Sequence, residues 1–182
     1  GEEKEYEKSL EKFDKLPIGK DFHFDVYPFD FTIVPLYTFL PEWARRENFE
    51  TMNSLLRDEW QRNKILKELP AISPENLIVS KAAKNEAVVG RSLKELKSIY
   101  GINDTKKALL QLMLTTELKA VVFYKNISDK LIKAAILHPR SILASNSASS
   151  SDKSFDKAIK SDRATSTFSK FISIVEKENL MP

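Results

Sequence analysis

The sequence predicts an α/β protein in which a short, mainly parallel sheet of about four strands is covered by helices. Two observations support this fold class. Short apolar runs typical of buried strands alternate along the chain with longer amphipathic segments typical of helices. Apolar residues make up 42% of the chain and charged residues 30%, a balance that allows one core of modest size in a globular domain.

Four segments have the pattern of strands. Residues 21–27 alternate in polarity, and the run at residues 120–124 is apolar throughout, which indicates a buried strand. Shorter apolar runs at residues 77–80 and 142–144 complete the set. Residues 28–46 are rich in aromatic side chains and prolines, so we expect a loop there.

Helices are expected around these strands, and polar capping residues mark where most of them begin. The first, at residues 2–16, has Tyr6, Leu10 and Phe13 on one face and is ended by Pro17 and Gly19. The others are expected at residues 48–69 (capped by Asn48), 92–100 (a capping box of Ser92 and Glu95, ended by Gly101), 104–118 (starting at Asp104) and 128–137 (capped by Ser128).

We expect residues 1–182 to form a single domain. Residues 145–162 are polar and of low complexity, rich in Ser, Lys and Asp, and are expected to be a flexible surface loop. The alternative is a lid over an active-site mouth, because loops that follow barrel strands carry function.

Three motifs, in order along the chain, are similar to segments of one enzyme family. Residues 25–29 and 40–44 are similar to a segment that reads Asp-x-Tyr-Pro-Tyr and to the Leu-Pro-x-Trp that follows it. Residues 138–147 are similar to a strand that follows His-Pro and ends in Ser-Asp-Gly. Residues 163–168 are similar to Arg-Ala-x-Gly-Thr-Phe before a C-terminal helix. The chain thus resembles the C-terminal portion of the N-acyl-D-amino-acid deacylases, members of the amidohydrolase superfamily.

This resemblance implies a fold derived from a TIM barrel. A closed (β/α)₈ barrel takes about 200–250 residues, and this chain has 182. We therefore expect a partial barrel excised from a longer chain; a natural chain that has lost its N-terminal strands is the alternative. Its sheet edges would pair with the rest of the parent barrel or, in isolation, favour dimerisation.

The resemblance also assigns the catalytic position. In the family, the Asp that ends the last strand binds metal and takes the proton of the attacking water. Asn146 stands at that position here, after Ser145, and Ser147 replaces the family's Gly. A neutral amide cannot act as a general base at neutral pH, so no catalytic residue is expected in this chain.

Substrate anchors follow from the same resemblance. Tyr27 and Arg163 match the family's Tyr and Arg that hold the substrate carboxylate. Ile33, next to Thr32, stands where the family has a Ser, and Ser161-Asp162 replaces the His-Pro that precedes the Arg. Tyr27 and Arg163 are therefore the expected substrate-binding residues.

Zinc is the cofactor that the resemblance implies, but the chain supplies few ligands for it. There is no cysteine, and the two histidines are His23 and His138, whereas a zinc site needs three or four converging ligands. We expect no metal site in this chain. His23 is expected at the core edge or facing solvent, and His138 at a helix end, where the dipole favours a cation.

Two functions remain open. The first is the C-terminal region of an amidohydrolase-like protein, with no hydrolysis expected from this chain alone. The second is a non-catalytic binding or scaffold domain that reuses the fold and grips the carboxylate of an N-acyl amino acid or peptide, since a guanidinium fork suits a carboxylate.

Charge and hydropathy exclude other classes of partner. The net charge of +3 is small and Lys and Glu are interspersed, so nucleic acid is not an expected partner. The sequence has no apolar run of about 18 residues, so no membrane-spanning segment is expected. We expect a cytoplasmic protein.

Overall fold

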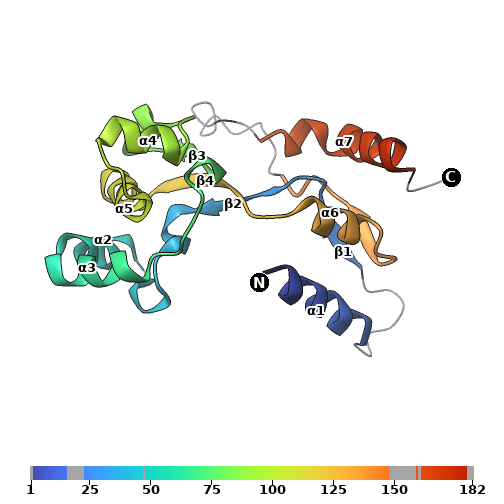
Figure 1. The fold of residues 1–182 in the computed structure, drawn as a ribbon, viewed down its shortest axis with the longest axis horizontal. Helices are drawn as coiled ribbons and strands as arrows, with labels where there is room; N and C mark the ends of the chain where they lie inside the picture. Colours follow the sequence, from blue (N-terminus) through green and yellow to red (C-terminus); the bar gives the residue numbers. More distant parts are fainter. Residues whose placement is uncertain (1, 16–22, 47, 148–158, 160, 180–182) are drawn as a thin grey trace. The chain divides into compact units, whose positions relative to one another are not determined.

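The computed structural model describes residues 2–15, 23–46, 48–147, 159 and 161–179. The chain forms two compact units. The first unit combines Gly1–Asp30, Asn126–Ser151 and Ser161–Pro182, and the second combines Phe31–Lys125 with Asp152–Lys160. Figure 1 gives the elements of both units along the chain.

The first unit is built on a pair of parallel strands. Its elements are α1 (Glu2–Lys15), β1 (Phe24–Val26), α6 (Asp129–Ile136), β5 (Ser141–Leu143) and α7 (Arg163–Glu178). β1 pairs with β5 in the register Phe24↔Ser141 to Val26↔Leu143. Val26 packs against Ile132 and Ile136 of α6, and Phe171 and Ile174 of α7 lie against the same cluster. The helices thus cover one face of this pair, as the apolar side of a parallel sheet requires.

Phe31–Lys125, the larger part of the second unit, is inserted into the chain between β1 and α6. The main-chain oxygen of Asp30 accepts hydrogen bonds from the main-chain N–H groups of Asn126 (3.1 Å) and Ile127 (3.0 Å). The chain therefore leaves the first unit and returns to it at neighbouring points. Such adjacent ends are typical of sites where a domain can be inserted without disturbing its host.

A three-stranded antiparallel sheet forms the frame of the second unit. Its strands are β2 (Phe31–Pro35), β3 (Leu77–Ala82) and β4 (Ala120–Lys125), in the order β2-β4-β3. A bulge lies between Val79 and Lys81 on β3. The remaining elements are η1 (Leu36–Phe39), η2 (Glu42–Ala44), α2 (Phe49–Arg57), α3 (Glu59–Glu68), η3 (Pro74–Asn76), η4 (Glu86–Val88), α4 (Leu93–Tyr100) and α5 (Thr105–Thr115).

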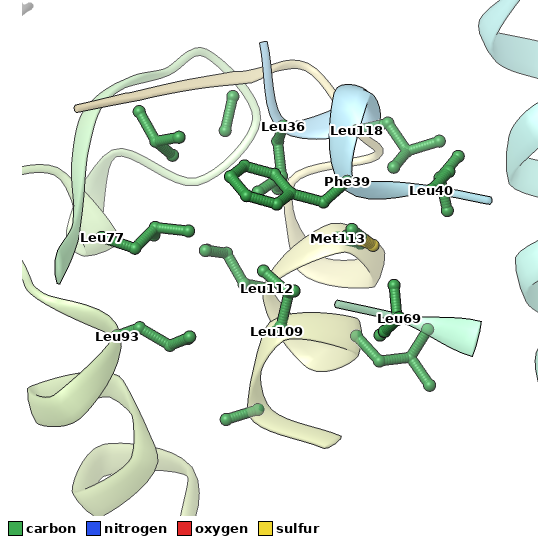
Figure 2. Close-up of a cluster of buried hydrophobic side chains, with 14 of the residues drawn as sticks. Leu36, Phe39, Leu40, Leu69, Leu77, Leu93, Leu109, Leu112, Met113 and Leu118 are labelled. Atoms are coloured by element: carbon green, nitrogen blue, oxygen red, sulfur yellow. The ribbon is translucent and has the colours of Figure 1, made fainter. Parts of the chain in front are cut away.

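The core of the second unit lies between its sheet and its helices. Figure 2 shows Leu109, Leu112 and Met113 of α5 among side chains from η1, β3 and α4. Leu112, Met113 and Leu77 are fully buried. Leucine dominates this core, and its clustering supplies the main stabilising term of the unit through apolar surface removed from water.

The α/β class is confirmed, but the expected sheet is not. A single, mainly parallel sheet is wrong: one strand pair is parallel, and the other three strands form a separate antiparallel sheet. The expected loop at residues 28–46 contains β2. The prolines of this segment led to the prediction of a loop. However, β2 is an edge strand and Pro35 is its last residue, and a sheet tolerates proline at such a position.

Local helix signals were more reliable. Asn48, Asp104 and Ser128 each accept a hydrogen bond from the main chain at the start of their helices, as expected. The helix expected at residues 48–69 is broken at Asp58, whose extended backbone ends α2 and whose carboxylate caps α3 by accepting from the N–H of Gln61. The predicted stop at Pro17 and Gly19, and most of the loop at residues 145–162, lie outside the described residues.

The capping box of α4 gives a pH-dependent prediction. Hydrogen bonds from the Ser92 main chain and hydroxyl hold the pKa of Glu95 below its usual value. Its contribution to stability is therefore present above the ordinary pKa of a glutamate and is lost as pH falls through the lowered one. We expect Glu95→Gln to be less stable than wild type at pH 7 and equal to it in acid; urea unfolding at both pH values measures this. A difference that is the same at both pH values would contradict it.

Candidate functional site

The candidate site lies at the carboxyl ends of β1 and β5 in the first unit. Tyr27 directly follows β1, and Ser145 and Asn146 lie just beyond β5. Because the two strands run parallel and in register, these residues lie at the same end of the strand pair. Asn146 has a φ of 45°, a left-handed conformation that asparagine adopts more readily than most residues.

Arg163, the first residue of α7, contacts the residues at this end of the strand pair. Its side chain is almost fully enclosed, and the residue is 4% exposed. The Nε–H donates to the main-chain oxygen of Ser145 (3.2 Å), and Nη2 donates to the main-chain oxygen of Asn146. The guanidinium carbon lies 3.9 Å from the centre of the Tyr27 ring. The structure thus brings Tyr27 and Arg163 together.

These contacts explain how a cation can be buried at this position. Arg163 stands at the N-terminal end of α7, where the helix dipole disfavours positive charge. A buried charge also needs partners for its donors. The two strand-end carbonyls supply acceptors, and the aromatic face of Tyr27 adds a cation–π contact. The guanidinium therefore holds the end of β5 and Tyr27 against α7. We call its contacts with Ser145, Asn146 and Tyr27 the Arg163 latch.

A second cation–aromatic contact lies two helical turns further along α7. The ammonium of Lys170 lies 4.2 Å from the ring centre of Phe29, which is buried. Arg163 and Lys170 are seven residues apart and so lie on one side of α7, while Tyr27 and Phe29 are two apart in the segment after β1. Lys170 was not predicted from the sequence; its spacing of seven residues from Arg163, matched to the two aromatic residues Tyr27 and Phe29, is the signal that marks it.

A hollow of about 390 Å³ lies beside the Tyr27 segment. Asp25, Val26 and Tyr27 line one side of it, and Ile132 and Ala135 of α6 line another. Arg163 is not among its lining residues. The hollow and the Arg163 latch thus share Tyr27 but are otherwise built from different residues.

The residues at these strand ends do not form a set of ligands suited to a zinc ion. Asn146 offers a neutral amide where the family resemblance places a metal-binding carboxylate. Within the described part of the chain, no three His, Cys, Asp or Glu side chains are grouped so as to hold a metal.

The two histidines have different surroundings. His23 is exposed. His138 follows the end of α6, and its ring stacks at a tilt against Phe24 with 5.0 Å between ring centres. Its Nδ1 accepts from the N–H of Arg140 (3.2 Å), and its Nε2 lies 3.5 Å from Oδ1 of Asp14. These contacts involve His138 in the packing of the turn before β5.

Ile33 and Thr32, the positions compared with the family's Ser, lie on β2 in the second unit. Ile33 is partly exposed, and the Thr32 hydroxyl is 3.5 Å from the main-chain oxygen of Tyr124 on the neighbouring strand.

Across the described residues, no helix is both long and apolar enough to cross a membrane. No family model matches the sequence, and no curated protein matches it.

Among solved structures, the chain is similar to N-acyl-D-glutamate deacylase from Bordetella bronchiseptica, crystallised with zinc and a phosphonate inhibitor that mimics the tetrahedral intermediate of its reaction. The TM-score is 0.60 and the sequence identity is 15%. The match covers 96% of this chain and 28% of the length of that enzyme. This likeness shows that the chain has a fold shared with part of a deacylase.

Proposed function

We propose that this chain is the C-terminal region of an amidohydrolase-like protein related to N-acyl-D-amino-acid deacylases, and that it does not hydrolyse amides by itself. The observation that carries the proposal is the convergence of Tyr27, the Ser145–Asn146 segment and Arg163 at the ends of two parallel strands. These residues are far apart in the sequence and lie together at the carboxyl ends of the two strands.

Two further observations support this proposal. The fold is shared with part of a solved deacylase. The three sequence motifs that resemble the deacylases contain Tyr27, Asn146 and Arg163, and these residues lie together at the carboxyl ends of the two strands. Asn146 supports the second half of the proposal, because a neutral amide cannot take a proton from an attacking water.

The direct test is hydrolysis of N-acetyl-D-glutamate by the wild-type chain and by Asn146→Asp, each with added zinc. Metal-assisted hydrolysis needs both a metal that lowers the pKa of bound water from ~15.7 toward ~7 and a base that receives its proton. Asn146→Asp restores a carboxylate but no further ligands, so we expect both proteins to equal the protein-free blank. Turnover that rises with protein concentration and is lost with a chelator would overturn the proposal.

A second candidate function is carboxylate binding without hydrolysis. The juxtaposition of Tyr27 with a guanidinium at a helix N-terminus favours it, because both the cation and the dipole attract an anion. The Ser145 and Asn146 carbonyls take two of the five N–H donors of Arg163, so a carboxylate would bind through the remaining donors. The two candidates therefore differ in whether Arg163 responds to a carboxylate ligand.

A further inference from the structure

The chain contains two Asn-Ser pairs, Asn146-Ser147 after β5 and Asn53-Ser54 within α2. Asparagine is a chemically labile residue, because the main-chain nitrogen of the next residue can attack its side-chain amide carbon. A small residue such as serine in the next position leaves that attack unhindered. The two pairs therefore have the same intrinsic chemistry, and the fold decides how fast each one reacts.

The reacting groups of Asn146 and Ser147 are unrestrained. Asn146 is exposed and belongs to neither a helix nor a strand. Within the described ranges, its side-chain amide has no hydrogen-bond partner, and the main-chain N–H of Ser147 donates to no acceptor. Arg163 donates to the main-chain oxygen of Asn146, which draws electron density from the peptide group that contains the Ser147 nitrogen. Loss of the proton from that nitrogen is thereby favoured.

Asn53 is the opposite case. Its Nδ2 donates to the main-chain oxygens of Phe49 (2.8 Å) and Glu117 (3.1 Å). Ser54 lies in the interior of α2, where the helix uses its main-chain N–H. Attack of the Ser54 nitrogen on the Asn53 side chain would require these bonds to break and a turn of helix to unwind. The fold therefore protects this pair.

We infer that Asn146 is a site of spontaneous deamidation in the folded chain. The Ser147 nitrogen loses its proton and forms a bond to the side-chain amide carbon of Asn146. This closes a succinimide ring, and the side-chain nitrogen leaves as ammonia. Water then opens the ring at one of its two carbonyl carbons. Cleavage at the side-chain carbonyl gives aspartate, and cleavage at the main-chain carbonyl gives isoaspartate; in both cases one water is consumed and one ammonia is released.

Deamidation changes the end of β5 in two ways. Both products add a negative charge to the residue whose main-chain oxygen accepts from Arg163. The aspartate product has the residue type that the family resemblance places at this position, whereas the isoaspartate product lengthens the main chain there by one carbon atom. The modification therefore alters both the charge and the backbone of the Arg163 latch.

The test follows both Asn-Ser pairs in the full chain by digestion and mass spectrometry during incubation at mildly alkaline pH. We expect Asn146 to deamidate at least about tenfold faster than Asn53, since breaking even one net hydrogen bond costs about that factor in rate. In urea that unfolds the chain, the two rates should become similar, because only the fold distinguishes the pairs.

Ser147→Val is the matched variant. Its branched side chain crowds the attacking nitrogen, so Asn146 should deamidate more slowly in the folded and in the unfolded chain, while the rate at Asn53 stays the same. The variant thus reports on the reaction even if it folds poorly. The inference is overturned if the folded chain shows less than the expected difference between Asn146 and Asn53, if that difference persists in urea, or if Ser147→Val leaves the rate at Asn146 unchanged.

Discussion

Arg163→Ala should lower the free energy of unfolding of the first unit by about 3 kcal/mol. The substitution removes two charged hydrogen bonds and leaves the Ser145 and Asn146 carbonyls without their donor. It also removes the cation–π contact with Tyr27. Each loss is of the kind that destabilises a protein most when the group is buried, as Arg163 is.

Both histidines lie in the first unit and both tryptophans in the second, so the two can be followed separately. Urea unfolding observed through the His23 and His138 ring protons reports on the first unit. Lys177→Ala, at an exposed position near the end of α7, is the control and should change stability little. If Arg163→Ala behaves like Lys177→Ala, the guanidinium does not hold the strand ends.

Leu112→Ala should destabilise the second unit by about 2–5 kcal/mol. Leu112 is fully buried on α5 and lies at the centre of the leucine core in Figure 2. Truncation removes apolar contacts and leaves a cavity that the surrounding helices and sheet can close only in part. Tryptophan fluorescence during urea unfolding measures the change, since Trp43 and Trp60 belong to this unit.

The matched control is Leu114→Ala on the same helix. Leu114 is only partly buried, so the same truncation removes fewer contacts and should cost less than half as much. Equal effects at the two positions would show that the packing around Leu112 is looser than its burial indicates.

Features set by neighbouring residues could be predicted from the sequence. The caps at Asn48, Ser92 and Ser128 are formed by residues three positions apart, so the pattern contains all the partners. The sequence also predicted parallel pairing among the strands, and β1 and β5 form one parallel pair, but which two strands would pair was not predicted.

Features set by distant residues could not be predicted in the same way. β2 became a strand because Phe31–Pro35 pairs with β4, whose residues lie about ninety positions further along the chain, and no local signal marks that pairing. This pairing also made the second sheet antiparallel. The division into two units follows from it, since β2 and β4 are the strands by which the chain enters and leaves the second unit.

The candidate site shows the same limit. The family motifs singled out Tyr27 and Arg163, and the structure places them in contact. Their role in substrate binding stays a prediction. The Arg163 donors bond to main-chain oxygens, which every residue possesses. The residue types at positions 145 and 146 therefore could not predict these hydrogen bonds.

The central claim is that Arg163 serves as an internal latch at the strand ends. Its Nε–H proton can be observed directly by NMR in the absence and presence of N-acetyl-D-glutamate. We predict that this proton exchanges with solvent far more slowly than that of the exposed Arg91, because it is enclosed and bonded to Ser145 O, and that the ligand leaves its resonance unchanged. Exchange as fast as that of Arg91, or a saturable shift of the Arg163 signal on adding the ligand, would contradict the account.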